Sequence, residues 1–301
     1  MKAAAVPSPD QTYLVAVSGG RDSMALLHWL NAGGCRNLIV CHLDHALRAT
    51  SAEEAGFVTA YAKTLGLPAC VARVEVEARE EAARDARYRF FASVARQHDC
   101  ASVILAHHAD DQVETFLFNL LRGGPSAMKP VAERLVDGVA LTLIRPLLAV
   151  WRDEIDAYIA QNRVSFCEDE SNSDPRFTRN RLRHESLPAL STAMGRDVRR
   201  AIWRAAEILG AEDEFLSAQP ELANVPVELE VAVLRTLPLA LRRRLIHGWL
   251  ASRGVSSVGF DEVESVLQLL TSRVAKVNLP GNLCARRRAK RIFLDHQTRG
   301  T

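Results

Sequence analysis

Short apolar runs alternate with helical patterns through the first half of the chain. Four runs are typical of buried strands: Tyr13 to Val17, Leu38 to Leu43, Cys70 to Val76 and Ser102 to Ala106. Between them, patterns typical of helices begin near Asp22, Ser51, Arg79 and Asp110. This alternation predicts an α/β fold with a doubly wound parallel sheet and helices on both faces. Ligands bind such sheets beyond the carboxyl ends of the strands.

The second half of the chain has a largely helical pattern, with glycine, proline and asparagine breaks. The polar segment SNSDPRFTRN ends at Asn180, and a new helical region begins between Leu190 and Gly210. We therefore expect two domains, residues 1–195 and a smaller, mainly helical domain of residues 196–301.

The composition is that of a globular protein, with 48% hydrophobic and 25% charged residues. No apolar run reaches the roughly eighteen residues that a membrane-spanning helix needs. The first residues, MKAAAVPSPDQ, do not form a secretory signal, because their apolar run is short and interrupted by proline. We expect a cytoplasmic protein.

Basic residues gather near the C-terminus although the net charge is only +2. From Thr271 onward, eight Lys or Arg residues accompany a single acid, Asp295. Such a density can bind nucleic-acid phosphates, and a solvated basic tail is the equally weighted alternative.

The stretch Ser18-Gly19-Gly20-Arg21-Asp22-Ser23 follows the first predicted strand and opens a helix. Two glycines let the backbone approach a ligand, and the exposed N–H groups at a helix N-terminus favour an anion. The two serines add hydroxyl donors. A phosphate-binding loop therefore explains this segment better than a tight turn that binds no ligand.

Two common nucleotide motifs do not describe this loop. The Walker A spacing G-x-x-x-x-G-K is missing, because no lysine follows the glycines, and G-x-G-x-x-G is also missing. The loop resembles the SGGxDS signature of the PP-loop ATP pyrophosphatases. That resemblance implies ATP binding at residues 18–23, adenylate transfer to an oxygen and release of pyrophosphate.

Two further segments lie at the same predicted sheet edge. Asp44, at the end of the second strand, is a candidate ligand for Mg2+, because this hard cation prefers carboxylate oxygens. Asp111 and Glu114 share a helix face and can together receive a cationic amine. Alternatively, they only complement the helix N-terminus. The adjacent His107 and His108 also imitate a metal cluster, although their spacing is not that of a standard metal site.

An arginine-rich segment offers a third candidate contact. Residues 176–183 contain four arginines, and Phe177 can stack on a base. A solvent-exposed helix start explains this segment equally well.

Six ordered blocks together resemble one family, the bacterial tRNA(Ile)-lysidine synthases. Its blocks read approximately SGGxDS, HxDHxLR, ARxxRY, AHHxDDQxET, RPLL and SNxDxxxxRNxxR, and all recur here in that order, from Ser18 to Arg183. The resemblance covers residues 13–190 closely and the later helical region more weakly.

This resemblance implies a ligase that forms a carbon–nitrogen bond. ATP adenylates the C2 oxygen of the wobble cytidine in an isoleucine tRNA with a CAU anticodon, and the side-chain amine of free lysine displaces AMP to give lysidine. Residues 1–195 would then be the ATP-binding catalytic domain, and residues 196–301 would recognise the tRNA. A homodimer is among the assemblies we consider.

The resemblance also implies roles for individual residues. Asp44 would support Mg2+ or the adenylation geometry, and Asp111 and Glu114 would hold lysine. Contacts to the nucleotide or the tRNA backbone would come from Arg179, Asn180, Arg181 and Arg183. Asp44, Asp111 and Glu114 are accordingly our candidate catalytic residues.

Two departures from the family pattern limit what can be carried over. After Gly123, the family's glycine-rich basic loop is replaced by Gly124-Pro125-Ser126-Ala127-Met128-Lys129-Pro130, and the sequence ends at residue 301, before the additional C-terminal tRNA-binding domain of longer members. We therefore expect tRNA contact to fall more heavily on residues 195–301.

Two other functions remain as alternatives. A PP-loop tRNA thiolase shares the ATP site, but the thiolases that resemble this chain carry C-x-x-C pairs, which this sequence lacks. A non-catalytic ATP-binding module would bind ATP without turnover and would make Asp111 and Glu114 incidental.

Overall fold

The chain folds into two compact units. The computed structural model describes residues 7–44, 51–75, 80–124, 126–168, 178–256 and 258–296. The first unit comprises Met1–Phe118 and Ala127–Ala206, and the second comprises Asn119–Ser126 and Glu207–Thr301. Across the described residues, we find no helix with the length and apolarity needed to cross a membrane.

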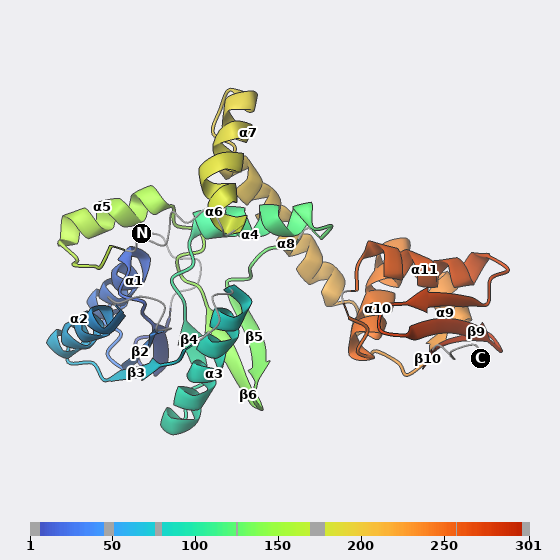
Figure 1. The fold of residues 1–301 in the computed structure, drawn as a ribbon, viewed down its shortest axis with the longest axis horizontal. Coiled ribbons are helices and arrows are strands. Elements are labelled where there is room, and N and C mark those ends of the chain that lie inside the picture. Colours follow the sequence, from blue (N-terminus) through green and yellow to red (C-terminus); the bar gives the residue numbers. More distant parts are fainter. Residues whose placement is uncertain are drawn as a thin grey trace. The chain divides into compact units, whose positions relative to one another are not determined.

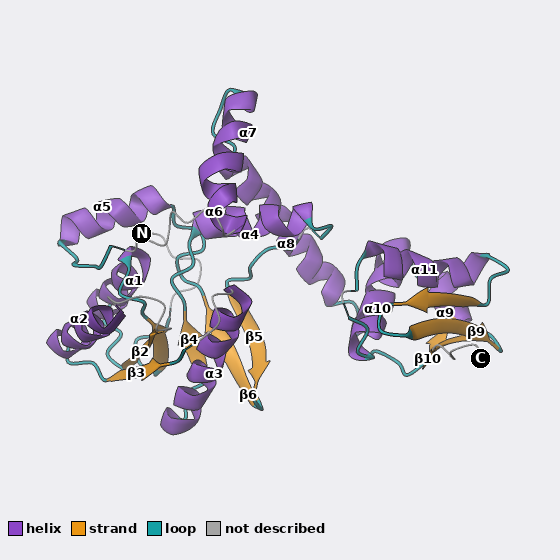
Figure 2. Ribbon diagram, in the orientation of Figure 1, coloured by secondary structure: helices purple, strands orange, loops and turns teal. Residues whose placement is uncertain are grey.

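A six-stranded sheet forms the centre of the first unit (Figure 2). Its strands, in spatial order, are β3 (Ala69–Arg73), β2 (Leu38–Asp44), β1 (Tyr13–Ala16), β4 (Ser102–Ile104), β6 (Val139–Ile144) and β5 (Val131–Val136). All neighbouring strands pair in parallel except β5 and β6. The predicted parallel sheet is confirmed, and the β5–β6 hairpin is an addition that the sequence analysis did not include.

Helices cover both faces of this sheet (Figure 1). Helices α1 (Arg21–Ala32) and α2 (Ser51–Thr64) share a core with Val15 and Val40, and α5 (Arg152–Asn162) packs against α1. The opposite face carries α3 (Glu80–His98), whose Phe91 packs in a core with Leu14. Leu14 and Val15 enter different cores because successive residues of a strand point to opposite faces.

The strand order reverses between β1 and β4. The chain runs outward from β1 to β2 and β3, then returns to place β4 on the other side of β1. In doubly wound sheets, the crevice at such a reversal lies outside the carboxyl ends of the two strands and binds the ligand. The phosphate-loop candidate follows β1, and the His107–Asp111 segment follows β4, so both lie at this crevice.

A helical group follows at the carboxyl end of β4. Its elements are α4 (Ala109–Leu121), α6 (Thr178–Arg181), a π-helical turn (Leu182–Ser186), α7 (Leu187–Met194) and α8 (Arg199–Ser217). Val113 and Leu117 of α4 form one core with Leu182 and Leu187. This core brings the arginine-rich segment against the first turns of α4.

The second unit combines helices with an antiparallel sheet. Its elements are η3 (Pro220–Leu222), β7 (Leu229–Glu230), α9 (Val231–Thr236), α10 (Leu239–Ser252), α11 (Phe260–Thr271), β8 (Lys276–Leu279), β9 (Leu283–Arg288) and β10 (Arg291–His296). The fully buried Trp249 lies in a core with Val266 and Ile292. The expected helices are present. The sheet, ordered β7-β10-β9-β8, was not predicted.

Candidate active site

The phosphate-loop candidate connects β1 directly to α1. Gly19 has φ +90°, and a Cβ atom there would lie 3.3 Å from Cγ2 of Val58, so both conformation and space favour glycine. The Ser23 hydroxyl accepts a hydrogen bond from the Ser18 backbone N–H at 3.2 Å and donates to the Gly20 carbonyl at 2.8 Å. These contacts fix the conformation of the turn at the N-terminus of α1, where backbone N–H groups favour the binding of an anion.

A cavity of about 640 Å³ opens beside this loop. Ser18, Gly20 and Ser23 line its polar side, and Leu43, Phe91 and Leu105 are among its apolar lining. A lining that combines polar groups with apolar side chains suits a ligand with a phosphate chain and a flat base.

The charged side chains of the loop bond to α5. Arg21 Nη1 donates to Asp156 Oδ1 at 3.0 Å. Arg152 Nη1 donates to both carboxylate oxygens of Asp22, at 2.9 and 2.7 Å. Burial raises the pKa of Asp22 above its ordinary value, although His108 and Arg152 oppose this effect. Arg21 and Asp22 line the cavity while bonded to these partners.

Asp111 and Glu114 lie together on α4, as their spacing predicts, and both contact Arg183. Arg183 Nε donates to Glu114 Oε1 at 2.6 Å, and Nη2 lies 3.1 Å from Glu114 Oε2 and 3.4 Å from Asp111 Oδ1. Glu114 is buried, whereas Asp111 and Arg183 are half-buried. Two acids and a guanidinium therefore form a compact cluster at the start of α4.

The two carboxyl groups have pKa values shifted in opposite directions. Burial raises the pKa of Glu114 above its ordinary value despite the contact with Arg183. Burial acts in the same direction on Asp111, but His108, His107 and Arg183 outweigh it and lower the pKa of Asp111. Asp111 is therefore the more firmly ionised member of the pair.

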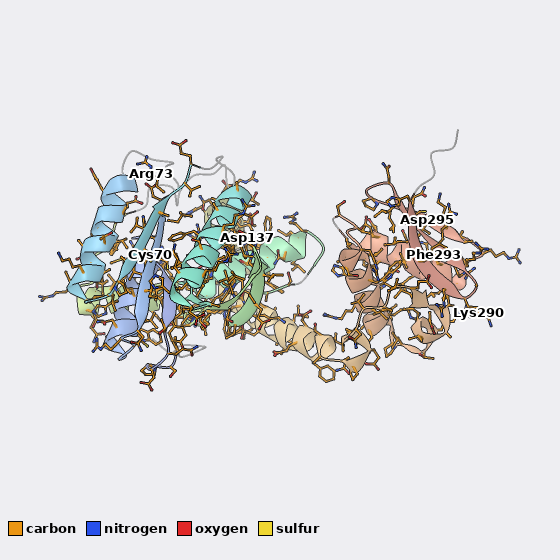
Figure 3. All side chains as sticks on the ribbon, turned by 90° about the horizontal axis from the view of Figure 1, so that it is seen from below. Cys70, Arg73, Asp137, Lys290, Phe293 and Asp295 are labelled. Carbon is orange, nitrogen blue, oxygen red and sulfur yellow. The ribbon has the colours of Figure 1, made fainter. Side chains whose placement is uncertain are left out.

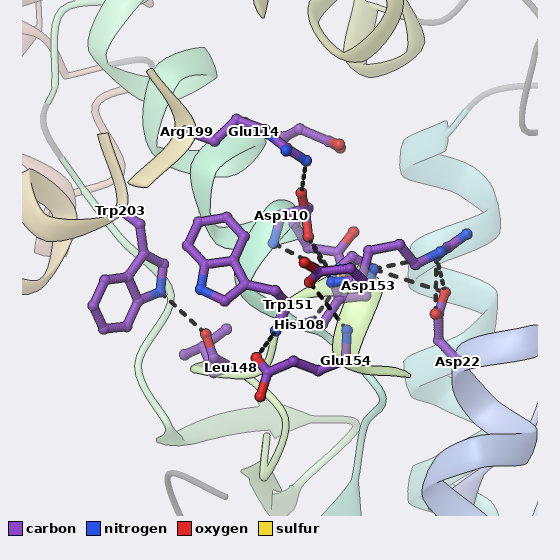
Figure 4. A network of polar contacts seen from close by, with 12 residues as sticks. Asp22, His108, Asp110, Glu114, Leu148, Trp151, Asp153, Glu154, Arg199 and Trp203 are labelled. Carbon is purple, nitrogen blue, oxygen red and sulfur yellow. Dashed lines mark hydrogen bonds and ion pairs between the residues drawn. The ribbon is translucent and has the colours of Figure 1, made fainter. Parts of the chain in front are cut away.

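His108 lies in a polar network with Asp110 and with Asp22 of the phosphate loop (Figure 4). Its Nε2 atom lies 3.5 Å from Asp111 Oδ2 and 3.8 Å from Asp22 Oδ2, and its ring is almost fully buried. Burial alone lowers the pKa of His108, but Asp111, Asp110 and Asp22 outweigh burial and raise it. His108 thus lies between two carboxylates from different helices, and both favour its protonated form.

The preceding residue, His107, lines the cavity instead. Burial lowers the pKa of His107 to about 4, with Asp111 opposing the shift and Arg145 reinforcing it. A neutral imidazole beside the phosphate loop can accept or donate one hydrogen bond. The pKa values of the two adjacent histidines are therefore shifted in opposite directions.

Asp110 connects three helices around this site. Its carboxylate accepts hydrogen bonds from the Arg152 backbone N–H of α5 at 3.0 Å and from Arg199 Nη1 of α8 at 2.9 Å. Burial raises the pKa of Asp110, but contacts with His108 and Arg152 outweigh it and lower the pKa to about 2. Asp110 fixes the beginnings of α4, α5 and α8 relative to one another.

The remaining candidates lie around this cluster. Asp44 is buried at the end of β2, and its Oδ2 lies 3.6 Å from Arg73 Nε. It is not among the residues that line the cavity. Arg179, Asn180 and Arg181 lie on α6, directly before Arg183. Residues 45–48 and 171–177 of the sequence blocks lie outside the described residues.

The sequence analysis did not identify two arginines that contact the site. Arg152 and Arg199 reach the site from α5 and α8, and neither belongs to one of the ordered blocks. His108 was considered for a metal cluster, whereas the structure surrounds it with carboxylates. Within the described ranges, no group of three or more His, Cys, Asp or Glu side chains is arranged to hold a metal ion.

Known proteins resemble this chain over most of its length. A family model described as a PP-loop domain matches residues 1–190, and one described as a TilS substrate binding domain matches residues 229–293. A tRNA(Ile)-lysidine synthase of Synechococcus is 35% identical, over 87% of this chain and 85% of that protein. The chain belongs to the tRNA(Ile)-lysidine synthase family.

Other relatives show how much of a lysidine synthase this chain covers. The tRNA(Ile)-lysidine synthase of Geobacter sulfurreducens is 38% identical, over 93% of this chain and 64% of that protein. The chain spans about three-fifths of the length of the first curated lysidine synthases that it matches. Among solved structures, the U34-tRNA thiolase NcsA from Methanococcus maripaludis, with its [4Fe-4S] cluster, superimposes with a TM-score of 0.53 at 14% identity, covering 68% of this chain and 74% of that one. This likeness concerns the fold alone.

Proposed function

We propose that this chain ligates lysine to C2 of the wobble cytidine in a CAU-anticodon isoleucine tRNA, with cleavage of ATP to AMP and pyrophosphate. One observation carries the proposal most directly. The paired carboxylates of Asp111 and Glu114 already hold a cation, Arg183, and His108 connects them to Asp22 of the phosphate loop. A cation-binding site directly beside a phosphate-binding loop fits a ligase that joins an amine to an adenylated substrate.

ATP is the nucleotide that we assign to the cavity. The backbone N–H groups and hydroxyls of Ser18 to Ser23 would bind its phosphates at the N-terminus of α1. Leu43, Phe91 and Leu105 would contact the base. His107 would remain neutral there and could donate a hydrogen bond without a full charge.

The reaction takes place in two displacements. The C2 oxygen of cytidine attacks the α-phosphorus of ATP, and the bond to the bridging oxygen breaks as pyrophosphate leaves. The uncharged amine of lysine then attacks C2, the C2–O bond breaks, and AMP leaves with that oxygen. Preorganised hydrogen-bond donors around the transferring group would stabilise the charge that develops on it.

The acid pair would bind and orient the lysine side chain. Asp111 stays ionised and attracts the ammonium group, whereas the raised pKa of Glu114 suits it to take up a proton as the amine becomes nucleophilic. Asp111 and Glu114 are accordingly our proposed lysine-binding and catalytic residues.

We also propose that Mg2+ accompanies ATP, with Asp44 as its candidate protein ligand. A lone carboxylate fits this ion, because Mg2+ at nucleotide sites is commonly held by one or two carboxylates together with substrate phosphates and water. When bound, the ion would neutralise phosphate charge. Asp44 would then exchange its contact with Arg73 for the ion.

The tRNA is the proposed partner of the second unit and of α6. In the unit's sheet, Arg287 contacts the carbonyl of Leu269 in α11 and that of Ser272 just after this helix, so the alternate residues Arg286 and Arg288 face away from it. Phe293 pairs with Arg286 in register, and Figure 3 marks it on this sheet with Lys290 and Asp295. Basic side chains around an aromatic ring suit an RNA surface.

On α6, Arg179, Asn180 and Arg181 would contact the nucleotide or the tRNA backbone. We retain residues 1–195 and 196–301 as the catalytic and tRNA-recognition domains.

Steady-state release of AMP tests the assigned roles. We expect Asp111→Asn to raise the KM for lysine at least about tenfold while leaving the KM for ATP nearly unchanged, because it removes the charge that attracts the amine and leaves Ser18 to Ser23 intact. Ser18→Ala should instead raise the KM for ATP. An Asp111→Asn enzyme with an unchanged KM for lysine would refute the amine site.

A further inference from the structure

Arg183 occupies the site that the proposed function assigns to the lysine ammonium group. Its guanidinium contacts both oxygens of Glu114, at 2.6 and 3.1 Å, and one oxygen of Asp111, at 3.4 Å. Side-on pairing of a guanidinium with a carboxylate is among the stronger charge-assisted arrangements in proteins. A substrate ammonium that binds the same oxygens has to compete with Arg183 for them.

The backbone that carries Arg183 has an unusual form. Residues Leu182–Ser186 form a π-helical turn, in which the Leu187 N–H bonds to the Leu182 carbonyl five residues earlier. Such turns are rare and frequently occur at functional sites. The wider turn brings Leu182 and Leu187, five positions apart, into the same core with Val113 of α4. Arg183 is thereby held beside the first turns of α4.

The charges make an exchange of cations feasible. Asp111 and Glu114 are compensated by one guanidinium, and one ammonium would leave the local net charge unchanged. Titratable groups near this pair, among the described residues, include Asp22 on α1, Asp110 on α4, Arg152 on α5 and His108, which directly precedes α4. The Arg183 side chain is 29% exposed, so it has access to solvent once it leaves the pair.

We propose that Arg183 is an internal ligand of the amine site, which substrate lysine has to displace, and that it thereby sets the affinity for lysine. This inference rests on the proposed function. A site that is occupied most of the time by its own side chain binds an external ligand more weakly, in proportion to the fraction of molecules in which it is open. Without such an occupant, the paired acids would also accept other small cations.

Calorimetric titration of the whole chain with lysine tests the exchange. Arg183→Gln empties the site, and we expect its Kd for lysine to fall about tenfold below that of the original protein. Arg183→Lys places another cation within reach of the acids, so its Kd should stay close to the original value. Arg36→Ala is the matched control, because Arg36 is an exposed arginine that bonds to Asn31.

Methylguanidinium serves as a second probe, independent of lysine. We expect it to bind Arg183→Gln and not the original protein. If folded Arg183→Gln binds methylguanidinium but no variant binds lysine, the result supports Arg183 as an internal ligand and refutes the proposed lysine site. If folded Arg183→Gln binds lysine no more tightly than the original protein, or does not bind methylguanidinium, the internal ligand is refuted.

A measurement on the original chain keeps the test independent of how the glutamine variant folds. The Nε–H resonance of Arg183, assigned by its loss in Arg183→Lys, should move toward the position of a solvent-exposed arginine as lysine is added. An Nε–H resonance that does not change at saturating lysine would overturn the proposal.

Discussion

Asp111 and Glu114 are three positions apart on one helix, yet their surroundings give them different chemistry. Glu114 is buried, which raises its pKa, whereas the cationic neighbours of Asp111 hold its pKa below the ordinary value. Pairs of titratable groups shifted in opposite directions are typical of sites that bind charge and move protons. One carboxylate can thus stay ionised to hold an amine while the other accepts a proton.

Gly19 is the residue of the phosphate loop whose replacement has the clearest expected result. Gly19→Ala introduces both a strained positive φ and a contact of 3.3 Å to Val58, so we expect the KM for ATP to rise about tenfold. Gly34→Ala is the matched control. It has nearly the same φ, +93°, but no heavy atom within 4 Å of its Cβ position. Both variants should melt at lower temperature, and an ATP effect of equal size in both would contradict the role of this loop.

Local sequence could predict the residues whose role follows from short spacing. Ser18 to Ser23 follow a strand and open a helix, and Asp111 and Glu114 share a helix face, so both groups could be chosen from the sequence. Arg152 could not, because it reaches Asp22 across 130 positions of chain. The occupation of the acid pair by Arg183 depends on a π-helical turn, which the residue pattern does not predict.

The helices and strands of the first unit follow the predicted alternation closely. Predicted strand and helix starts fall within a residue or two of those observed, because buried parallel strands are continuous apolar runs. The expectation that Cys70 to Val76 is buried was wrong, because β3 lies at the edge of the sheet and is exposed or half-buried along its length. The elements that the sequence analysis did not predict are antiparallel hairpins. The β5–β6 turn at Asp137-Gly138 has positive φ at both residues, and Asp-Gly is a strong hairpin signal that the sequence analysis did not use.

The second missed hairpin has a different cause. Ala289 and Lys290 have positive φ in the turn between β9 and β10, and neither is a residue that favours this conformation. The run of basic residues from Arg286 to Arg291 resembles a solvated tail. In the structure, Arg287 instead donates hydrogen bonds to the carbonyls of Leu269 and Ser272, and Arg286 and Arg288 face away from α11. The sheet therefore depends on contacts between residues that are distant in sequence.

Asp110 should stabilise the junction of α4, α5 and α8. We expect Asp110→Asn to lower the free energy of unfolding by about 1–2 kcal/mol at pH 7, because charged hydrogen bonds to Arg152 and Arg199 are weakened. Since folding lowers the pKa of Asp110 from 3.8 to about 2, its contribution is complete above pH 3.8 and is lost as the pH falls toward 2.

Urea unfolding at several pH values measures this effect. The difference between the original protein and Asp110→Asn should shrink as the pH falls from about 4 toward 2. Asp85→Asn, which removes a half-exposed surface pair with Arg134, is the control and should change little. A difference that stays constant with pH would show that the Asp110 charge does not stabilise the junction.

The whole chain brings together a PP-loop unit and a second unit with its own core and sheet. If the outward face of that sheet binds RNA, its affinity for tRNA should depend on basic side chains that are exposed there. We expect Lys276→Ala combined with Arg288→Ala to weaken tRNA binding and to reduce the slope of log K against log salt by about 1–2. The control is Arg253→Ala, another exposed arginine of this unit, which bonds to the Pro226 carbonyl. Equal losses in both proteins would refute the assignment of this face.

The most direct test of the whole account is the mass of the wobble nucleoside after reaction. A CAU-anticodon isoleucine tRNA transcript is incubated with ATP, Mg2+ and lysine, digested, and analysed by mass spectrometry. We predict that the wobble cytidine gains one lysine with loss of water, that the gain requires ATP, and that Asp111→Ala abolishes it. An unmodified cytidine after incubation with folded original protein and all three substrates would contradict the proposed ligase.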